Sequence, residues 1–127
     1  MVTDTLDLIQ EGFRILNQDS AEAGNYLLYA FHAEHSWEEA QCGVLCVAAG
    51  QFEPVLQDTM ALVRDVALDP TRRELIVARW YDLIRIPYAG PMKGQRTVLT
   101  ESLEDLYLSR AVQVYQGWLF TAWEYSD

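Results

Sequence analysis

The amino-acid sequence predicts an all-α fold: a single helical domain over residues 1–127, built as a bundle of five or six antiparallel helices. Apolar residues recur every three or four positions along most of the chain, which is the period of an amphipathic helix. Residues typical of helix starts precede several of these runs. A length of 127 residues, 50% of them hydrophobic and 22% charged, suits one domain with its own core.

Two helices are expected within the first 35 residues. The first is capped near Thr3 or Asp4 and would bury residues that share one face: Leu6, Ile9, Phe13 and Leu16. The second begins at Asp19 and Glu22, which have the spacing of a capping box, and ends near His35.

A third and a fourth helix should follow. Ser36 and Glu39 form a capping box at the start of the third helix, which runs to about Ala49. Pro54 fits the first turn of the fourth helix, whose inward face would hold Val55, Leu62, Val63 and Val66. Residues 37–70 also resemble one tetratricopeptide unit, through Gly43, the residues GQF at 50–52 and DP at 69–70, and this resemblance implies a helical hairpin.

Two further helices complete the predicted bundle. Asp69 and Pro70 would cap and start the fifth helix, which ends before Pro87 and buries Ile76, Trp80, Leu83 and Ile84. The segment IPYAGPMKGQRT contains two prolines and two glycines, and so predicts a long basic loop over residues 86–99. The last helix runs from Ser102 to about Tyr125, with an inward face made of Leu103, Tyr107, Val114, Trp118 and Ala122.

Charge is distributed unevenly along this chain of net charge -10. Residues 1–69 hold 12 acidic and 2 basic side chains, residues 70–99 hold 2 and 6, and residues 100–127 hold 5 and 1. Nucleic acids and anionic membranes are bound by clustered Lys and Arg, so neither is an expected direct partner. We expect a protein partner with a basic surface, with acidity for solubility alone as the alternative.

Cytoplasmic localisation is expected from three features. The longest run without a polar side chain, residues 42–50, is too short to cross a bilayer. The acidic N-terminal residues lack the basic start of a signal peptide. Two cysteines in a domain of this size do not suggest a disulfide framework, which agrees with a reducing compartment.

The segment FHAEHSWEEAQCGVLC, residues 31–46, raises the question of a metal or redox site. On one continuous helix, a single stripe would hold His35, Glu39, Cys42 and Cys46. A stable metal site needs three or four converging ligands, whereas this spacing brings only adjacent pairs together. Small apolar residues surround both cysteines, as in a buried helix. We therefore expect no metal and no cofactor here.

No catalytic residue is assigned, because the chain has no Gly-rich phosphate loop, nucleophile elbow, zinc-protease motif or zinc-finger spacing. His32 and His35 are expected on different sides of the second helix. Four basic residues allow two interpretations: they grip an anionic group, or they lie against the acidic first half of the same chain. These residues are Arg72, Arg73, Lys93 and Arg96.

The predicted function is protein–protein binding by a small acidic helical protein of the immunity, antitoxin, phage-inhibitor or adaptor type. The absence of catalytic motifs, the concentrated acidity and the available aromatic residues favour this function. Two alternatives remain open: a small enzyme with an unrecognised pocket, and a structural subunit that assembles with itself, for example as a homodimer.

Five residues are predicted to bind the partner. Glu38, Asp58 and Asp65 lie on the outward sides of their predicted helices and would speed association with a basic partner. Phe120 and Trp123 lie three positions apart on the polar arc of the last helix, where exposed aromatics are typical of interface anchors. The alternative is that the N-terminal helix or the basic loop covers them.

Overall fold

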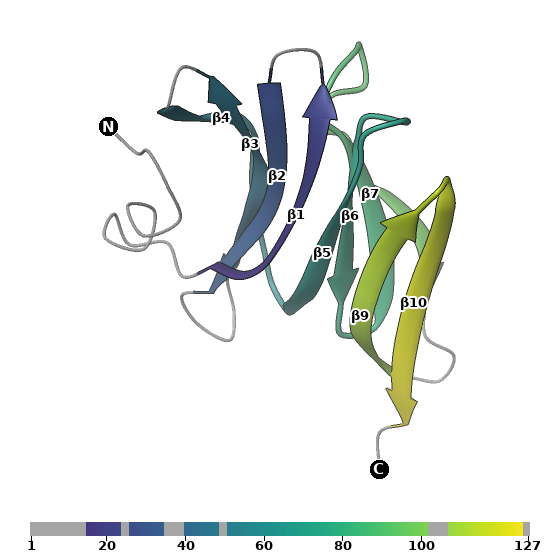
Figure 1. The fold of residues 1–127 in the computed structure, drawn as a ribbon. Coiled ribbons are helices and arrows are strands. Elements are labelled where there is room, and N and C mark those ends of the chain that lie inside the picture. Colours follow the sequence, from purple (N-terminus) through teal and green to yellow (C-terminus); the bar gives the residue numbers. More distant parts are fainter. Residues whose placement is uncertain (1–14, 24–25, 35–39, 49–50, 102–106, 126–127) are drawn as a thin grey trace.

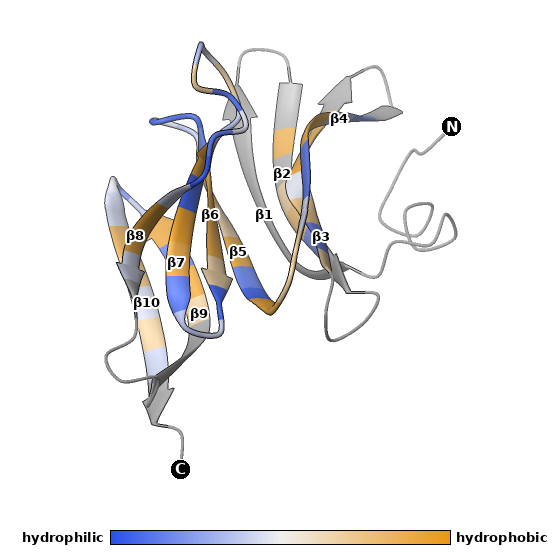
Figure 2. Cartoon of the chain, turned by 180° about the vertical axis from the view of Figure 1, so that it is seen from behind, coloured by the Kyte–Doolittle hydropathy of each residue, from blue (hydrophilic) through white to orange (hydrophobic). Residues whose placement is uncertain are grey.

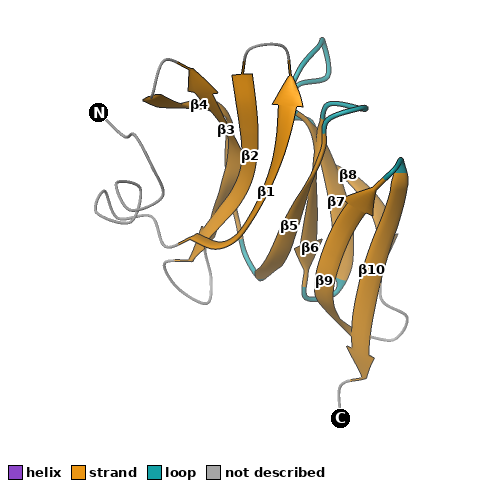
Figure 3. Ribbon diagram, viewed as in Figure 1, coloured by secondary structure: helices purple, strands orange, loops and turns teal. Residues whose placement is uncertain are grey.

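Every regular element among the described residues is a β-strand. The computed structural model describes residues 15–23, 26–34, 40–48, 51–101 and 107–125. Figure 3 shows these residues as strands joined by turns, with no helix among them. Accordingly, this part of the chain contains no helix long and apolar enough to span a membrane.

Ten strands form two four-stranded sheets and one hairpin. Sheet A has the order β1 (Ile15–Ala23), β2 (Tyr26–Glu34), β3 (Ala40–Ala48) and β4 (Gln51–Met60). Sheet B has the order β5 (Val63–Asp69), β6 (Glu74–Arg79), β7 (Asp82–Pro87) and β8 (Thr97–Glu101). Hairpin C pairs β9 (Tyr107–Tyr115) with β10 (Trp118–Tyr125). All of these pairs are antiparallel and join strands consecutive in sequence.

Sheet B is the middle layer of the molecule. Sheet A lies on one side of it and hairpin C on the other (Figure 1). The strand β5 makes contacts in both directions, to β1, β2 and β3 of sheet A and to β9 of hairpin C. A sheet covered on both faces has no solvated face, so both sets of its alternating side chains can be apolar.

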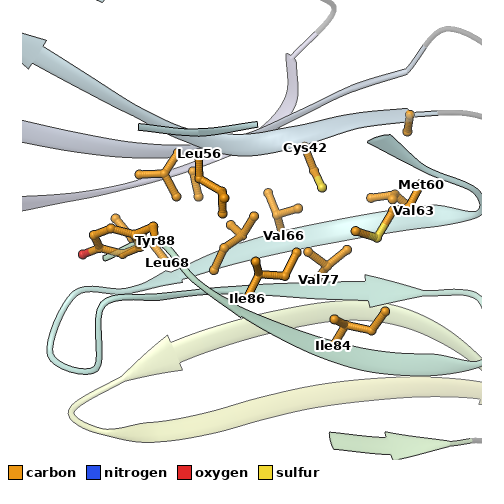
Figure 4. Close-up of a cluster of buried hydrophobic side chains, with 14 of the residues drawn as sticks. Cys42, Leu56, Met60, Val63, Val66, Leu68, Val77, Ile84, Ile86 and Tyr88 are labelled. Atoms are coloured by element: carbon orange, nitrogen blue, oxygen red, sulfur yellow. The ribbon is translucent and has the colours of Figure 1, made fainter. Parts of the chain in front are cut away.

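The larger core fills the space between sheets A and B. Alternate residues of β5 and β6 point into it, among them Val66, Leu68, Leu75 and Val77. The labelled side chains in Figure 4 show both sheets contributing: Cys42, Leu56, Met60, Val63, Val66, Leu68, Val77, Ile84, Ile86 and Tyr88. Burying a Val, Leu or Ile side chain contributes about 1.5–3 kcal/mol, so this layer contact is a principal source of stability.

A smaller core lies between sheet B and hairpin C. The intervening residues Ala67 of β5 and Ile76 and Ala78 of β6 form it, together with Leu83 of β7. From the hairpin, Val112 is buried, and Val114 and Trp123 pack against the cluster while partly buried. The carboxylate of Asp65 accepts a hydrogen bond from the backbone N–H of Val112 at 2.9 Å, which ties β9 to β5.

The predicted helical bundle is therefore wrong wherever the structure describes the chain. Four consecutive residues of β6, 75–78, are buried because alternate ones face sheet A and hairpin C. Such a run has no visible period of two, and short apolar runs do not distinguish a buried strand from a helix. Figure 2 shows hydrophobic residues along most of sheet B. The predicted function, as a helical binding protein, is contradicted by the same strands.

The predicted fifth helix shows how a turn was mistaken for a helix start. Asp69 Oδ1 accepts a hydrogen bond from the backbone N–H of Arg72 at 3.2 Å. An N-cap makes the same side-chain contact, but here it closes the turn between β5 and β6. Pro70 supplies the fixed φ of a turn, and Arg73 has the positive φ of 56° that ends it.

The other predicted helices have separate outcomes. Most of the first, together with the capping box at Ser36 and Glu39, lies outside the described residues. Strands β1 and β2 occupy the second, β3 the rest of the third, β4 and β5 the fourth, and β9 and β10 most of the last. The hairpin implied by the tetratricopeptide resemblance is β3 paired with β4, not a pair of helices. The predicted loop lies between β7 and β8, over residues 88–96.

Gly43 provides a direct test of sheet A. It pairs with Phe31 across β2 and β3, and a Cβ at this position would lie 2.9 Å from Cε1 of that ring. The same Cβ would overlap the backbone oxygen of Leu56, which cannot move as a flexible side chain would. Gly43→Ala should lower the free energy of unfolding by roughly 1–3 kcal/mol, measured by urea denaturation. An unchanged or raised stability, as Ala would give in a helix, would contradict this sheet.

Candidate functional site

The row of residues that the sequence raised as a possible metal site, and that we expected to hold no metal, does not form one stripe: its two cysteines are spread along one strand. Cys42 and Cys46 both lie in β3, four residues apart, which separates their Cα atoms by roughly 13 Å. His35 and Glu39 lie outside the described residues. Within the described ranges, no group of three or more His, Cys, Asp or Glu side chains could hold a metal ion. The two cysteines therefore do not converge on a common ligand.

A different row, across the strands rather than along one, brings three polar side chains together. His32 of β2 is the register partner of Cys42 of β3, and Cys42 is in turn the register partner of Asp58 of β4. Directly opposed antiparallel residues share a face, with Cβ atoms about 4.5–5.5 Å apart. His32 and Cys42 are fully buried. This His–Cys–Asp order contains the residue types of a cysteine nucleophile site.

The outer end of the row is an ion pair. Arg96 donates from Nε and Nη2 to the two carboxylate oxygens of Asp58, at 2.9 and 2.6 Å. The backbone N–H of Thr59 donates to the same carboxylate at 2.8 Å. The hydrogen bonds from Arg96 lower the pKa of Asp58 below its ordinary value, and partial burial opposes them only in part. Asp58 is therefore an anion at neutral pH.

The thiol in the middle of the row is not activated. Burial, reinforced by the negative charge of Asp58, raises the pKa of Cys42 to about 12. Five units above pH 7, only about one thiol in 10⁵ is a thiolate, and the thiolate is the nucleophile. Cysteine nucleophiles need the opposite environment, electropositive and partly exposed. We assign the row to packing between the sheets, with Asp58 and Arg96 closing its outer end.

Most basic side chains of residues 70–99 form ion pairs within the molecule. Four described ion pairs involve these side chains: Arg72 with Asp69, Arg79 with Asp82, Arg85 with Glu74, and Arg96 with Asp58. Two of these four carboxylates, Asp58 and Asp69, belong to the acidic first half of the sequence. The structure pairs these arginines within the molecule, although the side chain of Arg72 stays 57% exposed. No described residue forms an ion pair with Arg73 or Lys93.

The three predicted acidic binding residues have different surroundings. Glu38 lies outside the described residues. Asp58 is held by Arg96, as above. Asp65 accepts backbone hydrogen bonds from Val66 and Val112, each at 2.9 Å, and so joins two layers of the fold. Their contribution to partner binding stays a prediction, but Asp58 and Asp65 also have structural contacts to preserve.

The two predicted aromatic anchors separate in the structure. Phe120 is 55% exposed, whereas Trp123 is partly buried and packs against the core between sheet B and hairpin C. Trp118, which the helical pattern placed in the core, is 72% exposed. A two-residue turn explains the rearrangement: Gln116 and Gly117 both have positive φ, 50° and 80°, as a type I′ hairpin requires.

The outer face of hairpin C carries three exposed aromatic side chains. Trp118 pairs with Tyr115 beside the turn, and Phe120 follows two residues later on the same face. Tyr115 is 63% exposed. The described remainder of this face is uncharged: Ala111, Gln113 and Ala122. We define the aromatic face as Tyr115, Trp118 and Phe120.

Sequence reasoning found Phe120 but not its neighbours. The residues YQGW, 115–118, place two turn-forming residues between two aromatics, which is a pattern of a tight hairpin. Reading the segment with a period of two from this turn would have placed Trp118 and Phe120 on one face.

Comparisons with protein-family models, curated proteins and solved structures found no match for this chain.

The Asp58 ion pair should make a pH-dependent contribution to stability. A carboxyl whose pKa is lowered by folding stabilises the fold above its unfolded value, here near 3.8, and loses this effect as pH falls through the folded value. Because both side chains are partly solvated, Asp58→Asn should lower the free energy of unfolding by about 1 kcal/mol at pH 7. The difference from the unsubstituted protein should shrink below pH 4, measured by urea denaturation.

The exposed Glu53 of the same strand, substituted to Gln, is the matched control and should have little effect at either pH. An Asp58→Asn effect that is equally large at pH 3 and pH 7 would contradict the ion-pair account.

Proposed function

We propose that the protein binds a protein partner through the aromatic face of hairpin C. The observation that carries this proposal is the exposure of Tyr115, Trp118 and Phe120, 63%, 72% and 55%, on one face of one hairpin. Single exposed apolar residues are normal on protein surfaces, whereas three exposed aromatics on one hairpin face form a larger apolar patch. Tyr and Trp are enriched among the residues that contribute most to binding energy.

The fold does not require these side chains. The opposite face of the hairpin supplies Val112, Val114 and Trp123 to the core with sheet B, and none of the three exposed aromatics belongs to that core. The three aromatics together expose on the order of 300 Å², given a typical 150–250 Å² for each ring. That area is comparable to the largest apolar patches of monomeric proteins, which are often functional.

The geometry also limits the entropy lost on binding. Aromatic side chains have two rotatable χ angles and present a large contact area, so ordering them costs little for the area buried. Their strands are joined by a turn of only two residues, which fixes the register of the pair. A preorganised apolar face of this kind supports protein recognition.

Substitution of the aromatic face should separate binding from folding. Trp118→Ser with Phe120→Ser should change the melting temperature by less than about 2 °C, since exposed substitutions usually alter stability by under about 0.5 kcal/mol. Trp123→Ser should lower the free energy of unfolding by about 2 kcal/mol or more, because its ring packs against the core.

Binding is tested by cross-linking. A photo-reactive benzoylphenylalanine at position 120 should form one discrete protein adduct in the native host, and Trp118→Ser in the same chain should abolish it.

Met92 provides the matched control, because it is also exposed but lies in the loop between β7 and β8. The probe at position 92 should not give the same adduct. Unfolding of the Trp118 and Phe120 double variant, or equal adducts from positions 92 and 120, would contradict the proposal.

A further inference from the structure

The strand β10, which carries Trp118 and Phe120 of the aromatic face, is an edge strand among the described strands. Its hydrogen-bonded neighbour among the described strands is β9, on one side only. Residues 118–122 are all exposed and contain no charged side chain. Natural edge strands usually carry charges, proline or a bulge that prevent pairing with another chain. The register of β10 against β9 shifts only between Ala122 and Trp123, so the pairing of residues 118–122 is regular.

A positively charged group lies at the start of this edge. Arg72 Nη1 donates to the backbone oxygen of Gly117 at 3.4 Å, directly before Trp118. The same guanidinium is paired with Asp69, but the exposures of the two side chains differ greatly, 57% for Arg72 and 5% for Asp69. An approaching chain therefore reaches the arginine side chain more readily than the buried carboxylate of Asp69.

Other cations lie at the same end of the molecule. Arg73 belongs to the turn between β5 and β6, and its backbone oxygen accepts from the N–H of Tyr88 at 2.9 Å. This bond brings the 88–96 loop, with Lys93, beside that turn. Figure 1 shows this turn and loop at the end of the molecule where β9 turns into β10. Arg73 and Lys93 are both exposed.

We propose that β10 binds an extended segment of another protein by strand addition, with a carboxylate of that segment held at Arg72. The inference rests on the proposed function and specifies its binding mode. Strand addition obtains affinity from main-chain hydrogen bonds and specificity from alternate side chains, which here would pack on Trp118 and Phe120. An antiparallel added strand ends beside the start of β10, so its last residues or its terminal carboxylate meet the guanidinium.

Charge complementarity decides the occupant. The whole chain is strongly acidic, and its net charge alone favours a basic partner, but the charge next to Gly117 is the guanidinium of Arg72. Planar guanidinium groups bind carboxylates through paired N–H donors. We therefore commit to an extended segment that is apolar at alternate positions and carries carboxylate at its C-terminal end.

Labelled ten-residue peptides provide the test by fluorescence anisotropy. All share alternating Val and Thr, and their last three residues are Asp, Ser or Lys, each with an amidated C-terminus. A fourth peptide ends in Ser with a free carboxylate, which distinguishes a terminal from a side-chain source. The Asp peptide should bind at least tenfold more tightly than the amidated Ser peptide, and the Lys peptide most weakly. The fourth peptide should also bind more tightly than its amidated form, because an antiparallel strand places its terminal carboxylate beside Arg72.

Variants of the protein assign this preference to residues. Arg72→Gln should remove the tenfold preference, and Arg72→Lys, which keeps the charge without the planar group, should retain part of it. Arg64→Gln makes the same charge change near the start of β5 and should leave binding unchanged. Trp118→Ser should weaken every peptide. A melting curve for each variant shows that it is folded.

Each contrary outcome has a distinct meaning. Equal binding of the Asp and Ser peptides, tighter binding of the Lys peptide, or no effect of Arg72→Gln on a folded variant would overturn the inference. Absence of binding by all four peptides would also overturn it, while the adduct at position 120 tests the proposed function independently. A Trp118-dependent dimer in sedimentation would show that a second copy occupies β10 and would overturn it as well.

Discussion

The burial of β5 and β6 of sheet B on both faces is the constraint on which the other features depend. The strands β5 and β6 direct one set of side chains, including Val66 and Val77, toward sheet A and the other set, including Ala67 and Ile76, toward hairpin C. Because a period of two places neighbours on opposite faces, neither set can be polar without loss of a core. Small residues such as Ala67 and Ala78 on the hairpin side let the two-stranded layer approach closely.

This arrangement also explains why the aromatic face is available for binding. A two-stranded hairpin is marginally stable alone, and hairpin C has a layer to pack on because sheet B presents a second apolar face. The inner residues of the hairpin pack on sheet B, and Asp65 accepts a hydrogen bond from the backbone of Val112. The outer residues are not part of these contacts. Tyr115, Trp118 and Phe120 can then serve recognition without weakening the core.

The sequence indicated some positions correctly and the fold incorrectly, for related reasons. Val63, Val66, Ile76 and Leu83 were expected to be buried and are, because apolar side chains favour the core in either secondary structure, whereas Leu62 and Trp118 were expected inside and are exposed. The secondary structure was wrong because Leu75 to Ala78 are buried on both sides, which removes the alternation that reveals a strand. Asp69 was read as a helix cap because a turn uses the same side-chain hydrogen bond. Phe120 was identified as exposed, but Trp118 and Trp123 exchanged roles, because a helical period groups Phe120 with Trp123 whereas a strand period groups it with Trp118. The pairing of Arg96 with Asp58 depends on tertiary packing between residues 38 positions apart, which no local pattern reports.

Native-state hydrogen exchange tests the central claim most directly, because it measures the stability of each strand separately. If β6 is buried on both faces, its amides should exchange slowest and only through global unfolding. The outer strands β8 and β10, each paired on one side among the described strands, should exchange faster. Protection in β6 equal to or weaker than that in β10 would contradict a middle layer that holds the other two together.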